Sequence, residues 1–407
     1  MLTRNFKQSF AWITQYSEVS DSHCSRIDGH RAEVAILGGR GYHSNYGGVE
    51  NAVREIANQL AARHSLDVVI YGTDPSEVES STLRNTQLSF VYPPKPIYRR
   101  LGQHAAILFC VMHMLFISRP KTSLVFASGP NVFVPLLRLF GIPVVSSLRA
   151  VDSARDKWGF ISRKILQLGE FFAWRFSSSF TANSVEMVRE FSTRRQDVVF
   201  IPNGSVSAGK GCTQVIDRLG LKPNQYLLFA ARLDPVKRLD VLLESHSQIE
   251  PSKRLPLVIA GGHSKSKTYQ QHLESYSGPD VIFVGHLCAE ELLPLMFHCR
   301  AFLLPSVLEG MSNSLLSAMA TGRAVLASDI PPNADVLQNN NAVFRVDDID
   351  DLRQSLLRLC IDAQFAAELG ASLQRHALKT YTWERTADLF NEILKPYLSD
   401  HQNKEVK

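Results

Sequence analysis

Short apolar runs alternate with longer segments of helical periodicity along most of the chain. Residues 33–37 (EVAIL) form the first run and lead into Gly38-Gly39, a pair typical of a turn after a buried strand. Residues 49–60 place apolar side chains at helical spacing, and a second run at 66–72 (LDVVIYG) follows directly. Together these segments predict a strand, a glycine-rich turn, a helix and a parallel strand.

The same alternation predicts further elements in the first half. Strands are expected at 122–129, 142–148, 178–184 and 198–204, with helical segments from Asn131 and at 158–176. The longest apolar run, 105–117, is too short to span a bilayer and contains His113. It predicts a buried helix, and a helix lying against a membrane is the alternative.

The alternation begins again in the second half. Strands are expected at 225–233, 255–262, 281–287, 300–306, 323–330 and 341–347, and residues 382–398 have helical periodicity. Two α/β halves, each with a parallel sheet, therefore meet near Pro202-Asn203-Gly204. Ligands of such sheets bind at the carboxyl ends of the strands, which predicts a site in the cleft between the halves.

Composition agrees with a globular chain of two domains. The 407 residues exceed one ordinary core, and 45% are hydrophobic and 20% charged. Residues 31–203 contain 20 Lys and Arg against 13 Asp and Glu, whereas residues 204–407 contain 21 against 23. The mildly basic first half favours an anionic partner or an anionic membrane surface, and ordinary surface variation is the alternative.

The cysteines and the N-terminus indicate a cytoplasmic protein. No CxxC pair or zinc-like spacing occurs among the six cysteines, which favours reduced thiols (Cys24, Cys110, Cys212, Cys288, Cys299, Cys360). Residues 1–30 lack the continuous apolar core of a secretory signal. They are interpreted as an extension, either disordered or the product of a misplaced start.

The segment AARLDPVKRLD, residues 230–240, brings two cations to a predicted strand end. Arg232 lies at the end of the strand, and Lys237 lies where a helix is expected to begin. Two fixed cations beside the free N–H groups of a helix N-terminus favour a diphosphate ligand. Two solvated surface cations are the alternative.

The segment EGMSNSLLSAMATG, residues 309–322, follows another strand end. Glu309 precedes a helix expected from about Asn313, and Gly310 lets the backbone approach a ligand closely. The backbone N–H groups at the helix start suit phosphate, so the Glu309 carboxylate is expected to accept hydrogen bonds from sugar hydroxyls. A stabilising acid at a helix N-terminus is the alternative for Glu309.

These segments together resemble glycosyltransferases of family 4 with the GT-B fold, over nearly all the chain after residue 30. The motif GxxxxYGGxE, from Gly41 to Glu50, and the segment RAVDSARDKWG (149–159) resemble the bacterial rhamnosyltransferase-like branch that builds surface polysaccharides. The resemblance implies two Rossmann-like domains facing across a cleft, with a C-terminal helix crossing back to the first domain. Expected boundaries are 1–30 for the extension, 31–203 for the acceptor-side domain, 204–381 for the nucleotide-sugar domain, and 382–407 for the crossing helix and tail.

The resemblance also assigns roles to individual residues. It places Gly47 and Gly48 in the loop that lets donor phosphates and acceptor come close, and Arg232 and Lys237 on the donor diphosphate. Glu309 is expected near the donor sugar, and the backbone that follows on the diphosphate (Gly310, Met311, Ser312, Asn313, Ser314, Leu315). The implied reaction is retaining sugar transfer without a cofactor or metal, in which a nucleotide-diphosphate sugar donates to a polysaccharide or lipid-linked glycan. No nucleic-acid partner is implied.

Two positions depart from the family pattern. The family usually carries a second Glu at the position of Ser317, where it binds the nucleotide ribose. Three interpretations stay open: weaker donor binding, a thymidine nucleotide that lacks one ribose hydroxyl, or lost activity. Related chains tend to carry Asp or His near Arg149, so Arg149 and Asp152 are expected to contact acceptor or donor, and a surface salt bridge is the alternative for each.

The main rival to an enzyme is a non-catalytic GT-B homologue that acts as a binding or regulatory subunit in polysaccharide assembly, favoured by Ser317 and Arg149 together. A nicotinamide dehydrogenase is a poor fit, because the first predicted strand leads into GGRGYHSNYGG and no G-x-G-x-x-G follows it.

Overall fold

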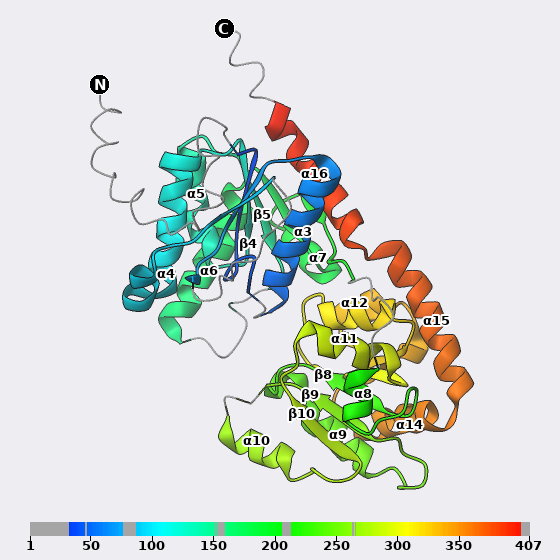
Figure 1. Ribbon diagram of the computed structural model, residues 1–407. Coiled ribbons are helices and arrows are strands. Elements are labelled where there is room, and N and C mark those ends of the chain that lie inside the picture. Colours follow the sequence, from blue (N-terminus) through cyan, green and yellow to red (C-terminus); the bar gives the residue numbers. More distant parts are fainter. Residues whose placement is uncertain are drawn as a thin grey trace, which may run out of the picture. The chain divides into compact units, whose positions relative to one another are not determined.

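The chain folds into two compact units in the computed structural model (Figure 1). Unit 1 comprises residues up to Pro202 together with residues from Trp383 onward, and unit 2 comprises Asn203–Thr382. The structure describes residues 32–44, 47–75, 87–150, 153, 159–205, 213–262, 264 and 266–399. The predicted extension 1–30 and Asp152 lie outside the described residues.

Unit 1 is built on a parallel sheet of seven strands in the order β3-β2-β1-β4-β5-β6-β7. Its central strands are short and wholly buried, which explains why they stand out as continuous apolar runs. The strands are β1 (Val34–Leu37), β2 (Val68–Tyr71), β3 (Leu88–Val91), β4 (Thr122–Phe126), β5 (Val144–Leu148), β6 (Ser179–Ala182) and β7 (Val198–Phe200).

Helices cover both faces of this sheet. One face packs against α3 (Gly48–His64) and α16 (Trp383–Ser399), and alternate residues of β1 point into that core. The other face carries the remaining helical elements: α4 (Lys95–His113), η3 (Met114–Ser118), η4 (Pro130–Phe133), α5 (Val134–Leu139), α6 (Phe160–Phe176) and α7 (Val185–Ser192). The last helix therefore belongs to the first domain, as predicted.

Unit 2 contains a second parallel sheet, of six strands in the order β10-β9-β8-β11-β12-β13. The strands are β8 (Leu227–Ala230), β9 (Leu257–Ala260), β10 (Val281–Gly285), β11 (Ala301–Leu304), β12 (Ala324–Ser328) and β13 (Val343–Phe344). Its helical elements are α8 (Gln214–Arg218), η6 (Pro235–Lys237), α9 (Leu239–Ser247), α10 (Lys267–Glu274), α11 (Ala289–His298), α12 (Asn313–Ala320), α13 (Pro331–Leu337), η7 (Asn340–Ala342), α14 (Ile349–Ile361) and α15 (Ala363–Thr380). Because β8 and β11 are parallel neighbours, the loops that leave them emerge at the same edge.

The longest apolar run forms the second part of α4 and continues into η3. One side of this stretch packs in the core of unit 1, so the predicted buried helix is confirmed. Lys95–Ser118 is long and apolar enough to cross a membrane, yet 44% of its most apolar window is buried inside the fold. Gly102 (φ 76°) has non-helical dihedral angles and separates a basic first part from this apolar part.

His113 is a buried titratable group within this core. Its Nδ1 atom lies 3.1 Å from the Tyr71 hydroxyl, and burial lowers the pKa of His113 to about 4. The folded chain therefore keeps the imidazole neutral while the unfolded chain binds a proton below about pH 6.5. Since the unfolded state binds more protons there, stability falls as the pH drops from about 6.5 towards about 4.

We expect His113→Gln to weaken this acid sensitivity. The loss of unfolding free energy between about pH 7 and pH 5 should shrink by about 2 kcal/mol, because the titrating imidazole is gone while a polar side chain remains beside Tyr71. Urea denaturation at both pH values measures the effect, with the exposed His272→Gln as control. An unchanged acid dependence in His113→Gln would contradict the assignment.

Candidate functional site

The loop that leaves β8 presents both predicted cations. Arg232 follows the strand with its side chain exposed, and among the described residues no carboxylate pairs with it. Asp234 caps the next turn by accepting a hydrogen bond from the backbone N–H of Val236 at 3.3 Å. Lys237 ends that 3₁₀ turn, and α9 begins two residues later at Leu239. The cation thus stands on a tight turn before the helix, and not in the helix itself.

The loop that leaves β11 meets this turn directly. The Lys237 Nζ atom lies 2.5 Å from Glu309 Oε1, and both side chains are largely shielded from water, with 15% and 9% exposed. The backbone N–H of Val307 donates to the carbonyl of Val236 at 3.0 Å. The structure therefore brings together Lys237 and Glu309, which the sequence places on separate motifs.

Glu309 leads into α12 through a built helix start. Ser312 is the N-cap residue, and its hydroxyl accepts a hydrogen bond from the N–H of Leu315 at 3.4 Å. Ser312 and Ser314 hydroxyls lie 3.0 Å apart. α12 thus begins four residues after Glu309, and its N-terminus carries a partial charge of the same sign as the Lys237 ammonium.

Asn203 fastens this loop and was interpreted from the sequence only as part of a linker. Its Nδ2 group donates to the Met311 carbonyl at 3.0 Å and to Asn313 Oδ1 at 2.7 Å, and its backbone N–H lies 3.0 Å from the Met311 sulfur. All three residues belong to unit 2. The buried Asn203 side chain therefore holds the segment between Glu309 and α12 in place.

Ser317 lies one turn further along α12, with 7% of the residue exposed. A hydroxyl therefore stands at the position where the glycosyltransferase family that the sequence resembles usually carries a carboxylate. A hydroxyl makes weaker hydrogen bonds than a charged carboxylate, and the ribose contact expected there stays a prediction.

In unit 1, the predicted glycine loop joins β1 to α3. Gly47 is the extended N-cap residue of α3 and makes no side-chain cap. Glu50, in the first turn, is buried and accepts a hydrogen bond from the backbone N–H of Arg40 at 3.0 Å. Gly39 has φ 64°, and a Cβ atom there would lie 2.8 Å from the Glu50 carboxylate. Glu50 therefore shapes the loop in which Gly47 and Gly48 lie, a role that the motif alone does not reveal.

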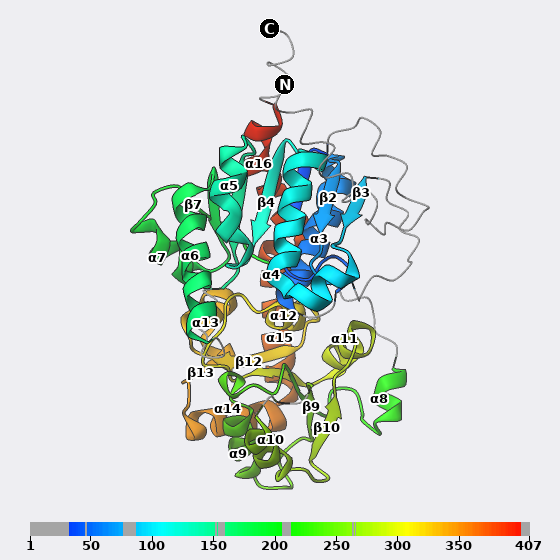
Figure 2. The same cartoon turned by 90° about the vertical axis from the view of Figure 1, so that its left-hand side faces the viewer.

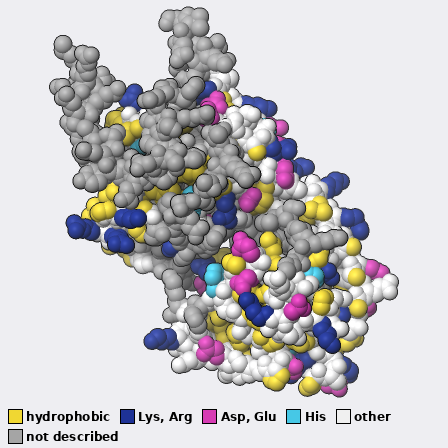
Figure 3. All heavy atoms as spheres, viewed as in Figure 1, with side chains coloured by type: hydrophobic (Ala, Val, Ile, Leu, Met, Phe, Trp, Pro, Cys, Tyr) yellow, Lys and Arg dark blue, Asp and Glu magenta, His cyan; other side chains and the backbone are white. Residues whose placement is uncertain are grey.

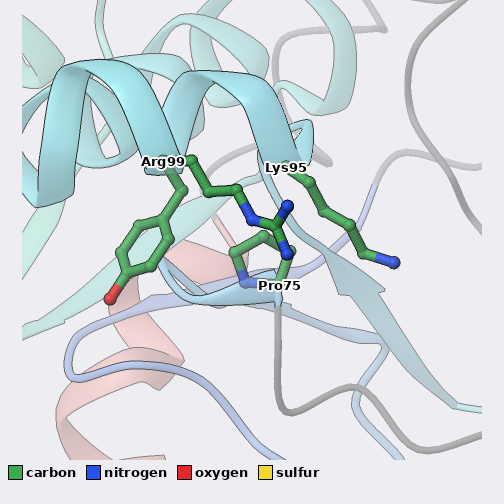
Figure 4. A pocket seen from close by; sticks show the side chains of 4 residues that line it. Pro75, Lys95 and Arg99 are labelled. Carbon is green, nitrogen blue, oxygen red and sulfur yellow. The ribbon is translucent and has the colours of Figure 1, made fainter.

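A small pocket lies at the start of α4, beside this loop. Pro75, Lys95, Tyr98 and Arg99 line it, and Figure 4 shows the Lys95 and Arg99 side chains extending from the helix, with the Arg99 guanidinium over Pro75 in this view. The Tyr98 hydroxyl donates to Asp74 at 2.9 Å. These residues were not predicted from the sequence, although three cations lie within the six positions from Lys95 to Arg100.

Arg149 lies in the interior of unit 1, so the surface position considered for it is wrong. Its guanidinium stacks over the rings of Phe126 and Phe390, at 5.1 Å and 5.4 Å, and donates to the Ile201 carbonyl at 3.4 Å. Burial lowers the pKa of Arg149 to about 9. Contact with acceptor or donor stays a prediction for this residue.

Within the part of the chain that the structure describes, no three His, Cys, Asp or Glu side chains gather as a candidate metal site. The four described cysteines are free thiols (Cys110, Cys288, Cys299, Cys360). Metal independence of the site stays a prediction.

Comparison with known proteins gives two matches to domain families. The family described as Glycosyltransferase Family 4 matches residues 46–205, and the family described as Glycosyl transferases group 1 matches residues 224–362. The second match contains Arg232, Lys237 and Glu309.

Curated relatives match over less than half of the chain. The serotype-specific mannosyltransferase WbdA of Escherichia coli is 29% identical over 190 residues, which cover 45% of this chain and 23% of the relative. A D-inositol 3-phosphate glycosyltransferase from a Nocardioides species is 30% identical over 192 residues, covering 42% of this chain and 41% of the relative. The match thus spans about a quarter of WbdA and less than half of the second relative.

Solved structures match over nearly the full length. Sucrose-phosphate synthase from Thermosynechococcus elongatus aligns with a TM-score of 0.74 at 17% identity, covering 91% of this chain and 100% of that chain. The Anabaena protein HepE, in complex with UDP and glucose, aligns with a TM-score of 0.73 at 18% identity, covering 90% and 100%. At such identities the likeness concerns the fold.

We expect Asn203→Ala to loosen the Glu309 loop. Two hydrogen bonds are lost and their acceptors in Met311 and Asn313 lose a partner, which should lower the unfolding free energy by about 1–3 kcal/mol. Urea denaturation of the full chain measures the change, and Asn341→Ala on the exposed surface of unit 2 is the matched control. If both variants unfold at the same urea concentration, Asn203 does not hold the loop.

Proposed function

Because the chain has the GT-B fold and carries two glycosyltransferase domains, we propose that it transfers a sugar from a nucleotide-diphosphate donor with retention of configuration. The proposed acceptor is a polysaccharide or a lipid-linked oligosaccharide, and the proposed location is cytoplasmic, with peripheral contact at the membrane. The single observation that carries the proposal is the shielded Lys237–Glu309 pair in front of α12.

The chemistry of this pair supports sugar transfer. A nucleotide sugar breaks its glycosidic bond to a diphosphate, and the departing β-phosphate gains negative charge as the bond opens. In the proposal Lys237, Arg232 and the N-terminus of α12 stabilise that charge, while Glu309 accepts hydrogen bonds from the donor sugar. The β-phosphate oxygen then takes the acceptor's proton as the new bond forms on the same face.

The donor is proposed to be a hexose or deoxyhexose nucleotide. The WbdA relative is a mannosyltransferase, and UDP and glucose are bound in the HepE structure. Ser317 favours a nucleotide that needs only one hydrogen bond at the sugar of the nucleoside, which agrees with a thymidine diphosphate donor such as a rhamnosyl nucleotide. Rhamnosyl transfer is therefore the finer proposal.

A non-catalytic binding subunit is the second candidate, favoured by Ser317 in place of the usual carboxylate. Such a subunit would keep the diphosphate site without turnover. The two candidates differ in whether removal of the site's charges changes the rate of sugar transfer.

Removal of the charged groups should slow donor turnover. We expect Lys237→Ala and Glu309→Ala each to lower kcat for donor hydrolysis or transfer by about 10²–10³, because preorganised groups at developing charge have effects of that size. Release of nucleoside diphosphate by purified protein measures the rate. Arg238→Ala, which removes a neighbouring cation paired with Asp347 at 2.6 Å, is the matched control. Equal signals in all variants would support the binding subunit instead.

Ser317 should set the nucleotide preference. Among thymidine, uridine and guanosine diphosphates, we expect thymidine diphosphate to raise the Tm most in a thermal-shift screen. Ser317→Glu should strengthen binding of the two ribonucleotides by about tenfold or more, since a charge-assisted hydrogen bond contributes about 1.5–3 kcal/mol; Ser317→Ala is the control. A strong uridine or guanosine preference in the parent chain removes the rhamnosyl proposal and leaves sugar transfer standing.

A further inference from the structure

Exposed apolar side chains are concentrated on one face of unit 1. Fourteen large hydrophobic side chains are exposed among the described residues, and nine of them lie on α4, on α6, or at the end of α5. They are Leu101, Leu108, Leu139, Phe140, Phe160, Ile161, Leu168, Phe171 and Phe176. These nine side chains are called the apolar face below.

The three helices lie on the same side of the sheet. α4 and α5 pack into the same hydrophobic cluster on one face of the sheet, and α6 packs beside α5 and η4. Figure 2 looks onto this layer and shows α4, α5 and α6 in front of the strands. The apolar face is therefore the outer surface of one helical layer, and its exposed side chains are not scattered singly over the unit.

The same helices are strongly basic. They carry seven cations, namely Lys95, Arg99, Arg100, Arg138, Arg163, Lys164 and Arg175, against the single carboxylate Glu170. Glu170 is buried and accepts hydrogen bonds from the hydroxyls of Ser128 and Ser153, at 2.9 Å and 2.6 Å. It therefore adds little negative charge to the surface. Figure 3 shows dark-blue cations beside yellow hydrophobic side chains near the start of α4.

Cations and rings alternate on α6. The Lys164 Nζ atom lies over the Phe160 ring at 5.8 Å, and the Arg175 guanidinium lies over the Phe176 ring at 5.4 Å. Phe160 and Ile161, 77% and 74% exposed, stand at the first turn, and Leu168 and Phe171 continue the stripe. Aromatic and aliphatic side chains interleaved with Lys and Arg are the pattern of a helix that lies in a membrane interface.

We propose that the apolar face of unit 1 docks on an anionic lipid bilayer. The apolar side chains enter the headgroup boundary, and the six exposed cations of the same helices (all but the half-buried Arg163) meet the anionic headgroups. An acidic protein partner would match the charge, but nine apolar side chains spread over three helices suit a flat, fluid surface better. The inference specifies a partner for the proposed transferase, because a lipid-linked acceptor lies in that surface.

The face also reaches the functional edge of the sheet. α4 follows β3 and α6 follows β5, so both helices begin at the carboxyl ends of the strands, the edge that carries the glycine loop before α3. Docking there places the membrane next to the edge at which an acceptor is expected.

Vesicle flotation tests the proposal. The full chain should float with phosphatidylcholine vesicles containing about 30% phosphatidylglycerol and much less with pure phosphatidylcholine. Phe160→Ser combined with Ile161→Ser should reduce binding by about tenfold or more, and Lys164→Glu by about fivefold or more. Binding should also fall in about 0.5 M NaCl, where surface charges are screened.

Matched controls separate this inference from catalysis and from misfolding. Ile361→Ser with Leu378→Ser removes two exposed apolar side chains from unit 2 and should leave vesicle binding unchanged. Lys237→Ala should also float like the parent, so a failed transferase proposal does not affect this result. Thermal unfolding should be the same for the parent and the Phe160→Ser/Ile161→Ser variant, because both positions are exposed.

Three outcomes overturn the proposal. The first is a folded parent chain that stays in solution with anionic vesicles, and the second is a Phe160→Ser/Ile161→Ser variant that floats as well as the parent. The third is a parent dimer in light scattering that this variant converts to a monomer, because the apolar face would then bind a second copy of the chain.

Discussion

The ion pair between Lys237 and Glu309 is the interaction on which the site depends. It joins the loops that leave β8 and β11, two parallel neighbours, and places one cation and one carboxylate at the carboxyl edge of the sheet. Because the pair is largely shielded from water, removal of one partner leaves the other charge poorly solvated. The Lys237–Glu309 pair is therefore already formed without a bound ligand, as preorganised electrostatic stabilisation requires.

Local contacts keep that pair in its geometry. The Val307–Val236 backbone hydrogen bond aligns the two loops, Ser312 caps α12, and Asn203 fixes the Met311 carbonyl. Asn203 is also the first residue of unit 2. The first residue of unit 2 thus helps to hold the candidate site, so substitutions of Asn203 should alter the position of Glu309.

The predicted GT-B architecture is confirmed. Its central strands were predictable because buried parallel strands appear in a sequence as continuous apolar runs. The edge strand β3 was not predicted, because its Ser89 is exposed and interrupts the apolar pattern. Lys237 and Glu309 were predictable site residues, because each is a charged residue on a loop that follows a predicted strand. The support from Asn203 was not predictable, because it spans 110 positions. Arg149 was expected to contact acceptor or donor, with a surface salt bridge as the alternative. Its burial was not predictable, because Phe126 and Phe390, which enclose it, are distant in sequence.

A crystal structure with a bound nucleoside diphosphate tests the central claim most directly. We predict that the diphosphate lies against Lys237 Nζ and the backbone N–H groups at the start of α12, with the Arg232 guanidinium turned towards it. A diphosphate bound elsewhere, with Lys237 still contacting Glu309 alone and Arg232 in solvent, would contradict the claim.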